Sequence, residues 1–573
     1  MHIQIDDPFH SWPVSTFVAS LPVLVLLGLL ASGKASAWAA ALIGLIVAMA
    51  AAVFAFQTPV TIVAMSAVYG VTFALFRVVW LIVAAVFLYD IAVATGQFEI
   101  MKASIARLSG DRRIQAILVA FSFGAFIEGA AGFGAPVAIS AAFLVGLGFK
   151  PFQAALLCLI ANTAPVAWGA IGTPIRTLAG VTGLDVQALS ATSGRILPLL
   201  SLILPFWLVK TMTTWRKTFE VWPALLVVGG SFAAAQFFWS NWMTFELVDI
   251  VSAVASLVAG VVLLRFWKPK HEWRFDHDLE ADAHALALAQ DSELPNTPEI
   301  PIITVLSARR VARAWMPFLL LTAAVLVWGI PSLKTKMDAR TSWKWAIPGL
   351  HLQVFKGAAV TKHAEPTEKD REPALADIVP ISSTGSAVFL AAVLSGLFLG
   401  VSPLRQARML AQTTLRLFPA IAAIFGMLAL GFVTKYSGMD VVLGLAFTRT
   451  GPWLYPIFGT LLGWLGVALT GSDTSSNILF GNLQKFTATE LGLNPILMAS
   501  ANTTGGVMGK MIDAQSIVVA AAATGEGGQE GKLLRAVFWH SIALALLVGA
   551  IVWVYAHVLP GMVAVPVKTA LGG

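Results

Sequence analysis

Charge and cysteine are both scarce in this chain. Only 12% of its 573 residues are charged, and Cys158 is the single cysteine. One cysteine excludes a disulfide within the chain and a metal cluster held by several thiolates. Because 58% of the residues are hydrophobic and the mean hydropathy is +0.81, the chain is too apolar for an ordinary soluble domain. We therefore expect a membrane protein.

Signatures of soluble enzymes and of ATP-driven pumps are also absent. No Gly-Lys-Ser/Thr phosphate loop occurs, and Gly132-Phe-Gly-Ala-Pro136 lacks the strand–helix context of a dinucleotide-binding loop. No serine or histidine pair stands out within the apolar segments, where His540 and His557 have no evident partner. We predict that the chain is not an enzyme and holds no cofactor and no metal. An intramembrane enzyme is the alternative of another class.

Apolar segments suited to crossing a bilayer recur from end to end. Such a span needs about 20 residues. Tryptophans 239, 242, 267 and 315 lie at span ends, where membrane interfaces favour them. The sequence predicts an all-α polytopic membrane protein with about 12–14 transmembrane helices. The most apolar stretches are residues 17–30, 37–56, 196–209, 224–239, 251–266, 316–330 and 536–556.

The net charge of +7 is concentrated in four loops, and cytoplasmic loops of membrane proteins carry such an excess of Lys and Arg. This placement argues against a nucleic-acid partner. The first ten residues contain Asp6 and Asp7 but no Lys or Arg, so we expect a periplasmic N-terminus without a cleavable signal. The basic residues are Lys102, Arg107, Arg112 and Arg113; Lys210, Arg216 and Lys217; Arg309, Arg310 and Arg313; and Arg405, Arg408 and Arg416.

Two polar stretches divide the chain. We expect a first transmembrane half at 1–266, a cytoplasmic loop at 267–313, and a second half at 314–573 with an extracytoplasmic insert at 333–383. The first polar stretch contains His271, His277 and His284, but its many acids and prolines favour a solvated loop over a metal site.

One apolar stretch contains residues that a lipid-facing helix does not tolerate. The segment from Glu128 to Pro136 holds an acid, three glycines and a proline. Freed backbone groups find no partner in hydrocarbon, so broken helix at membrane depth is accepted where it lines a cavity. The segment therefore indicates a transport site.

The same order of features occurs twice. Glu128–Pro136 is followed by a Gly–x–x–Pro turn ending at Pro151, an apolar run, and Asn162-Thr163. A second break at residues 470–477 is followed by a turn ending at Pro495, an apolar run, and Asn502-Thr503. We predict two repeats, at about 114–210 and 450–560. Span counting from the basic loops makes them inverted, which places a substrate site midway through the membrane.

Neutral hydrogen-bonding residues gather at the two breaks. They suit a hydroxylated organic anion, because a carboxylate needs donors and a hydroxyl needs both a donor and an acceptor. Half-helix N-termini at the breaks would add free N–H groups. Alternatively, these residues cap the broken helices themselves. The candidate binding residues are Asn162, Thr163, Ser472, Thr474, Ser475, Asn477, Asn502 and Thr503.

Asp473 and Glu128 are the acids at the breaks and the candidates for proton coupling. An ionised acid at membrane depth is paired, wet or protonated. We predict Asp473 as the proton carrier, because neighbouring hydroxyls can serve either protonation state, and Glu128 as a structural or gating acid. Lys510 could pair with Asp513 or Asp473, or attract the substrate. Arg77 could be a counter-ion, although snorkelling or an internal pair is favoured.

These motifs together resemble the bacterial L-lactate permease family over nearly the whole chain. They are Glu128-Gly-Ala-Ala-Gly-Phe-Gly-Ala-Pro136, Gly146-Leu-Gly-Phe-Lys-Pro151, Asn162-Thr-Ala-Pro165, Gly471-Ser-Asp-Thr-Ser-Ser-Asn477 and Asn502-Thr-Thr-Gly-Gly506.

The resemblance implies uptake of lactate and glycolate with protons across the bacterial inner membrane, and a fold like that of the ion-transporter superfamily. The chain departs from the family pattern at Asp513-Ala514, where relatives often have Ser-Pro. Sodium coupling is the alternative within the same class, because Ser, Thr and Asn at unwound helices also bind sodium.

Overall fold

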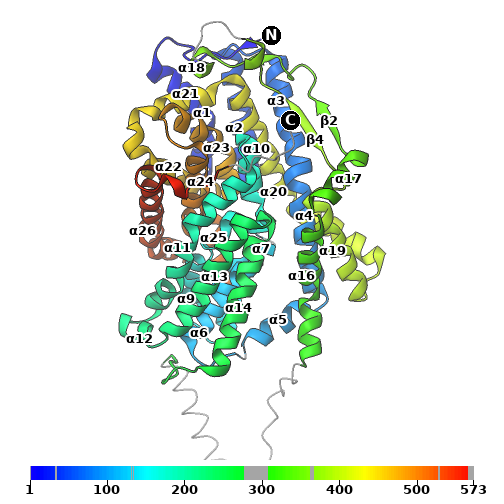
Figure 1. Cartoon of the computed structure of the whole chain (residues 1–573), viewed down its shortest axis with the longest axis vertical. Coiled ribbons are helices and arrows are strands. Elements are labelled where there is room, and N and C mark those ends of the chain that lie inside the picture. The colour runs from blue at the N-terminus through cyan, green and yellow to red at the C-terminus, as the bar shows by residue number, and fades with distance from the viewer. Residues whose placement is uncertain are drawn as a thin grey trace, which may run out of the picture.

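The chain forms a helical bundle with very little strand (Figure 1). The computed structural model describes residues 2–31, 35–106, 108–130, 132, 135–275, 307–328, 330–361, 367–526 and 529–565. Within these residues, strands form two small sheets. In the parallel one, β1 (His2–Ile3) pairs with β3 (Val354–Phe355); in the antiparallel one, β2 (Trp343–Ala346) pairs with β4 (Leu375–Ile378).

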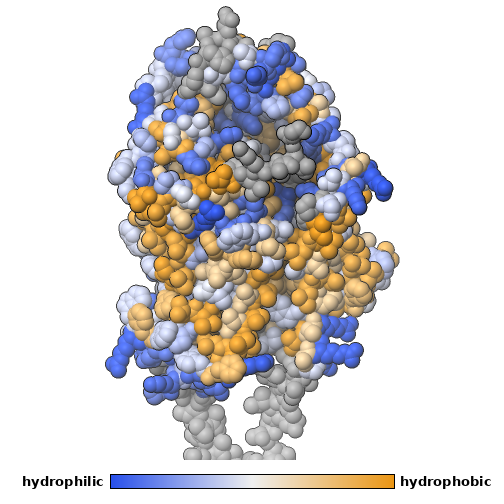
Figure 2. Space-filling view, in the orientation of Figure 1, coloured by the Kyte–Doolittle hydropathy of each residue, from blue (hydrophilic) through white to orange (hydrophobic). Residues whose placement is uncertain are grey.

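Among the described residues, eight helices are long and apolar enough to cross a membrane. A ninth span arises if the pair Pro151–Ala161 and Val166–Thr182, bent by 65°, crosses as one unit, and shorter apolar helices add to these. Figure 2 shows an apolar band between polar ends. The predicted all-α polytopic membrane fold is confirmed. The eight are Val60–Ala94, Arg112–Ala130, Val186–Met212, Trp222–Trp242, Phe245–Phe266, Ala308–Trp328, Pro403–Ser437 and Glu530–His557.

The two ends of the bundle differ in composition. The basic helices α6 (Arg112–Ala116) and α12 (Trp215–Phe219) lie together at the lower end in Figure 1, which we call the basic end. The N-terminus, β2, β4 and α17 (Pro331–Thr341) lie at the upper end, which we call the insert end. The predicted division of the chain at 266/267 and 313/314 stays a prediction.

The two repeats have the same order of elements. In the first, Arg112–Ala130 (α6, η2 and α7) is followed by α8 (Ala135–Gly146), α9 (Pro151–Ala161), α10 (Gly169–Thr182) and α11 (Val186–Met212). In the second, α22 (Gly451–Thr470) is followed by α23 (Asp473–Glu490), α24 (Pro495–Gly509), α25 (Ala514–Thr524) and α26 (Glu530–His557). Each repeat is broken after its first helix and again after its third.

In each repeat, a helix that follows a break packs on a helix that follows a break in the other repeat. Helix α8 of the first packs on α25 of the second, and α23 of the second packs on α10 of the first. The first repeat begins with α6 at the basic end, whereas the second follows α21 (Met439–Phe447) at the insert end (Figure 1). The copies are therefore inverted, and their breaks meet inside the bundle.

Five further helices supply most of a second apolar core beside the repeats. Small residues let these helices approach closely. A methyl group on Gly70 of α3, for example, would lie 2.5 Å from the Leu428 carbonyl oxygen of α20. The helices of this region are α1 (Trp12–Ala31), α2 (Ala37–Phe54), α3 (Val60–Phe73), α4 (Trp80–Ala94) and α20 (Pro403–Ser437).

The other helices described here pack mainly on the repeats and on α4. These helices are α5 (Gln97–Ala106), α13 (Trp222–Trp242), η4 (Phe245–Leu247), α14 (Val248–Phe266), α16 (Ala308–Trp328), α18 (Ala358–Thr361) and α19 (Thr384–Phe398).

Candidate functional site

A cavity of about 110 Å³ lies where the two breaks meet. This volume suits a molecule of a few heavy atoms and is well below that of a drug-sized site. One apolar wall, including Ile424 and Met427, comes from α20. Its polar lining comes from both repeats: Glu128, Thr173, Thr470, Ser472, Asp473, Thr474, Ser475 and Lys510.

The break in the second repeat turns a helix N-terminus towards this cavity. Helix α22 ends at Gly471, whose φ of 72° reverses the chain at low cost because glycine lacks a Cβ. Ser472 then caps α23, and its hydroxyl accepts the N–H of Ser475 at 3.3 Å. The first-turn N–H groups of a helix have no partner within the helix, so this end suits an anion.

Asp473 is held by a buried polar network. Its Oδ2 accepts a hydrogen bond from the Thr503 hydroxyl, and the Asn477 amide nitrogen lies 3.3 Å from the same oxygen. Asn477 also donates to Thr503 Oγ1 at 2.7 Å, and Asn502 donates to Asn477 Oδ1 at 2.9 Å. Asn477, Asn502 and Thr503 are not among the residues that line the cavity. Their hydrogen-bond network holds Asp473 in place at the cavity.

The break in the first repeat is more strongly distorted. Ala170, Ile171 and Gly172 have φ values of 45°, 59° and 72°, a run that only tertiary packing can hold. The Thr163 hydroxyl donates to the Ile160 carbonyl at 2.8 Å and faces a separate small cavity. Thr163 therefore caps its own helix in this structure.

Asn162 has a different environment. It is buried beside Glu128, and its carboxamide oxygen has no hydrogen-bond partner among the described residues. It does not line the cavity.

Lys510 is the cation of the cavity lining. Its Nζ donates to the Gly471 carbonyl at 2.6 Å and forms an ion pair with Asp513 Oδ2 at 3.1 Å. Asp513 Oδ1 accepts the N–H of Ser516 at 2.7 Å. Lys510 thus pairs with Asp513, one of its two predicted partners, and still reaches the cavity. Arg77 lies in η1 (Ala74–Val79), and its side chain is outside the described residues.

Two glycines keep space for the two acids. A methyl group on Gly169 would lie 2.6 Å from Glu128 Oε1, and one on Gly506 would meet Asp473 Oδ1. Both conflicts involve the end of an acid side chain. The added methyl group would therefore displace the acid and leave the backbone in place.

We expect Gly169→Ala and Gly506→Ala each to lower substrate uptake by about tenfold while the protein still inserts, because each displaces a cavity carboxylate by an ångström or more. Initial uptake rates at equal membrane expression measure this. Gly146→Ala is the matched control, because a methyl group there meets nothing within 4 Å. Normal uptake by both cavity variants would show that the positions of these acids do not matter.

Some features of the site have no counterpart in the predicted residues. Thr173 and the glycine at 169 line the cavity, and Pro174 offers its carbonyl to Asn477. In the sequence, glycines 169 and 172, which follow Asn162-Thr163, could have indicated that this segment belongs to the site. Asp249 lies behind Glu128, and its place at the start of an apolar run resembles an ordinary first-turn acid.

No group of three or more His, Cys, Asp or Glu in the described part of the chain is arranged to hold a metal ion. His277 and His284 lie outside that part.

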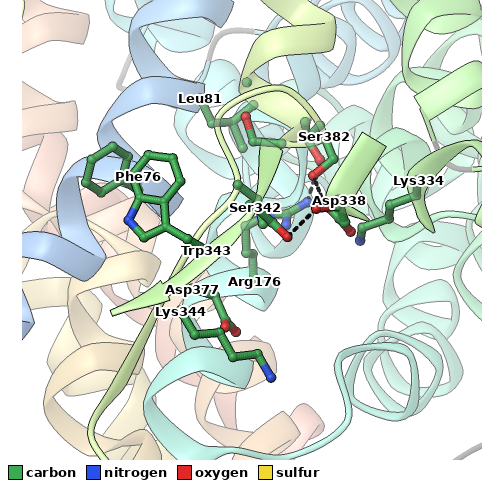
Figure 3. Close-up of a pocket in the computed structure, with 14 residues that line it drawn as sticks. Phe76, Leu81, Arg176, Lys334, Asp338, Ser342, Trp343, Lys344, Asp377 and Ser382 are labelled. Atoms are coloured by element: carbon green, nitrogen blue, oxygen red, sulfur yellow. Dashed lines mark hydrogen bonds between the residues drawn. The ribbon is translucent and has the colours of Figure 1, made fainter. Parts of the chain in front are cut away.

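A larger polar cavity of about 370 Å³ opens at the insert end, which we call the outer cavity (Figure 3). Lys334, Asp338 and Lys344 of the insert surround it, and Arg176 of α10 reaches it from the first repeat (Figure 3). An adjoining cavity of about 520 Å³ shares Arg176 and Lys334 and is also lined by Glu246. These cavities lead from the insert end towards the helices of the first repeat.

Sequence comparison identifies relatives over the full length of the chain. The Escherichia coli K12 glycolate permease GlcA is 44% identical over 566 residues, which are 98% of this chain and 99% of the relative. The L-lactate permease of Bacillus subtilis is 42% identical, with coverage of 96% and 97%, and that of E. coli K12 is 42% identical, with coverage of 98% and 99%.

Similar solved structures include Neisseria gonorrhoeae MtrF (TM-score 0.42, 13% identity, covering 85% of this chain and 83% of that one) and the Alcanivorax borkumensis YdaH transporter (TM-score 0.40, 13% identity, 84% and 86%).

The profile of the L-lactate permease family matches residues 15–559. With this match and full-length relatives above 40% identity, the chain belongs to the L-lactate permease family, a family of membrane permeases and not of enzymes.

Proposed function

We propose that this chain takes up lactate, glycolate and related 2-hydroxymonocarboxylates together with protons. The observation that carries the proposal is the cavity at the meeting point of the two breaks. It offers a cation, a helix N-terminus, hydroxyl side chains and two acids within a volume that fits a small anion. The permease names of the full-length relatives support the same substrates.

Each part of such a substrate would have a chemical partner in the lining of the cavity. Its carboxylate would lie between Lys510 Nζ and the first-turn N–H groups of α23, both of which favour negative charge. Its 2-hydroxyl would meet Thr474 and Ser475, which can donate and accept. The apolar wall from α20 would cover the rest of the molecule. Four predicted binding residues do not line the cavity and would instead hold the lining residues in place. They are Asn162, Asn477, Asn502 and Thr503.

Charge balance requires a coupling cation, and the two acids of the cavity favour the proton. A monocarboxylate is an anion, and entry against a negative interior needs at least one cation to cancel its charge. Asp473 and Glu128 line the same cavity and are the groups proposed to take and release that proton.

We place the basic end in the cytoplasm and the N-terminus in the periplasm of a bacterial inner membrane.

Sodium coupling is the second candidate. The Asp473 carboxylate and the Thr503 hydroxyl that donates to it place oxygen atoms together at the break, and oxygen atoms at an unwound helix also suit a sodium ion. The two candidates share the substrate site and differ in the driving ion.

Counterflow in proteoliposomes of the purified protein tests the substrate proposal. Vesicles loaded with unlabelled L-lactate should transiently accumulate labelled lactate from outside. Glycolate and D-lactate should compete, whereas a dicarboxylate or an uncharged amide of lactate should not. Equal counterflow of the uncharged amide would contradict carboxylate recognition by Lys510 and α23.

A further inference from the structure

A third buried acid lies next to the cavity and takes no part in the site described so far. Asp249 sits in the first turn of α14 with 1% of its surface exposed. Neither of its carboxylate oxygens has a hydrogen-bond partner among the described residues. An unpaired acid at membrane depth is costly, and such residues in transporters usually belong to ion or proton pathways.

The fold brings Asp249 against Glu128. Helix α14 packs on α7 (Gly124–Ala130), and a methyl group on Gly129 would lie 2.7 Å from the Asp249 Cβ. Because Gly129 has no side chain, Asp249 can lie over the peptide that follows Glu128. The two carboxyl groups interact electrostatically, and Glu128 Oε2 also lacks a partner among the described residues.

Asn162 supplies an independent sign that mobile protons or water belong here. Its carboxamide is buried beside Glu128, and the carboxamide oxygen has no hydrogen-bond partner among the described residues. Buried polar groups in native proteins are paired with protein or with ordered water. Three neighbouring side chains with unpaired atoms therefore indicate a small hydrated path between Asp249 and the cavity.

The other end of this path lies towards the cavity of about 520 Å³ that adjoins the outer cavity. Glu246 precedes Asp249 by three residues in the continuous span Phe245–Phe266, so the two share one face of the helix. Glu246 lines the adjoining cavity at the insert end and forms an ion pair with Arg176 at 2.5 Å. Asp249 thus lies about one helical turn further into the bundle than the Glu246–Arg176 ion pair, which lines the adjoining cavity.

Few other charges act on Asp249. Of the elements packed on α14, α7 contributes Glu128, η4 contributes Glu246, and α10 contributes the paired Arg176. Helix α13 and η2 (Ile117–Phe123) contain no ionisable side chain. In this part of the structure, no cation pairs directly with Asp249. Two neighbouring buried carboxylates without a direct cation partner disfavour double ionisation, so the pair shares a proton.

We propose that Asp249 and Glu128 form an acid relay that carries protons from the cavity lined by Glu246 to the cavity where the two breaks meet. In each transfer, one O–H bond breaks on the carboxylic acid and one forms on the neighbouring carboxylate, directly or through one water. Glu246, in its ion pair with Arg176, lies at the mouth of this route. The inference rests on the proposed proton-coupled uptake and adds the route by which its proton arrives.

The test compares net accumulation with exchange in the same proteoliposomes. Asp249→Asn should slow accumulation driven by a pH gradient by about tenfold or more, because a positioned acid speeds proton transfer by at least that factor. Lactate exchange, which needs no net proton movement, should stay close to that of the wild type. Azide, a small weak acid that carries protons, should restore accumulation by the variant.

Asp440→Asn is the matched control. Asp440 is also buried, but its carboxylate accepts a hydrogen bond from Asn482 at 3.0 Å, so we expect no azide-dependent change. If the Asp249→Asn protein does not insert, Asp249→Ala leaves space for azide and replaces it in the same assay.

Two results would overturn the relay. One is wild-type accumulation by Asp249→Asn; the other is a parallel loss of exchange and accumulation that azide does not repair. Wild-type vesicles separate this inference from the proposed function. If they exchange lactate but never accumulate it under a pH gradient, proton coupling fails and the relay with it, whereas a defect confined to Asp249→Asn and relieved by azide supports the relay.

Discussion

Asp473→Asn is expected to abolish lactate accumulation and preserve lactate exchange. Thr503 and Asn477 hold the Asp473 carboxylate at the cavity, and Asn can keep an oxygen acceptor in the same position but cannot carry a proton. The binding site therefore survives while net proton transport stops. Internal lactate should rise only to the external concentration, even under an imposed pH gradient.

The measurement uses labelled lactate in one vesicle preparation for both modes. Glu128→Gln is the comparison, and it should impair both modes together, because Glu128 belongs to the proposed relay and also lines the substrate cavity near Lys510. If Asp473→Asn accumulates lactate normally, or if only Glu128→Gln separates the two modes, the assignment of the carrier is wrong.

Replacing Lys510 is expected to have the second large effect. Lys510→Met removes the cation of the cavity lining, and a hydrogen bond to a charged group contributes about 1.5–3 kcal/mol. The half-saturation concentration for lactate should therefore rise by roughly tenfold or more. Uptake rates over a range of lactate concentrations measure the effect.

The single variant alone would be ambiguous, because it leaves Asp513 buried without its cation at 3.1 Å. An orphaned buried charge destabilises a protein by several kcal/mol. The double variant Lys510→Met/Asp513→Asn removes both charges and that penalty. Weak lactate binding should persist in it. Recovery of normal half-saturation would show that Lys510 serves only to neutralise Asp513.

Much of the fold could be predicted because glycines, prolines and apolar runs determine where helices break. The repeated turns before Pro151 and Pro495 marked equivalent helices, and the structure begins α9 and α24 at these two residues. The basic loops predicted the inversion of the repeats, since α6 of the first repeat lies at the basic end and α21, which precedes the second repeat, lies at the insert end.

The candidate site was harder to predict residue by residue. Ser472, Asp473, Thr474 and Ser475 line the cavity, because they form the cap and first turn of one helix. Asn477 lies one turn further along and turns to Asp473 and Thr503 instead. Side-chain type alone does not separate a ligand from a supporting residue when both are Ser, Thr or Asn.

Asp249 shows a different limit of sequence reasoning. An acid at the first turn of a helix has a common local explanation, because it stabilises the helix N-terminus. Its proximity to Glu128 depends on the packing of α14 on Gly129, more than a hundred residues away in the chain. Only the tertiary structure brings these two acids together.

The claim that lactate and protons move together is tested most directly by accumulation in proteoliposomes under separate ion gradients. We expect a pH gradient, acidic outside, to drive labelled L-lactate above its external concentration in sodium-free buffer, and a protonophore to abolish it. A sodium gradient at equal pH should leave the internal and external concentrations equal. Accumulation driven by sodium alone, with no response to the pH gradient, would contradict the account.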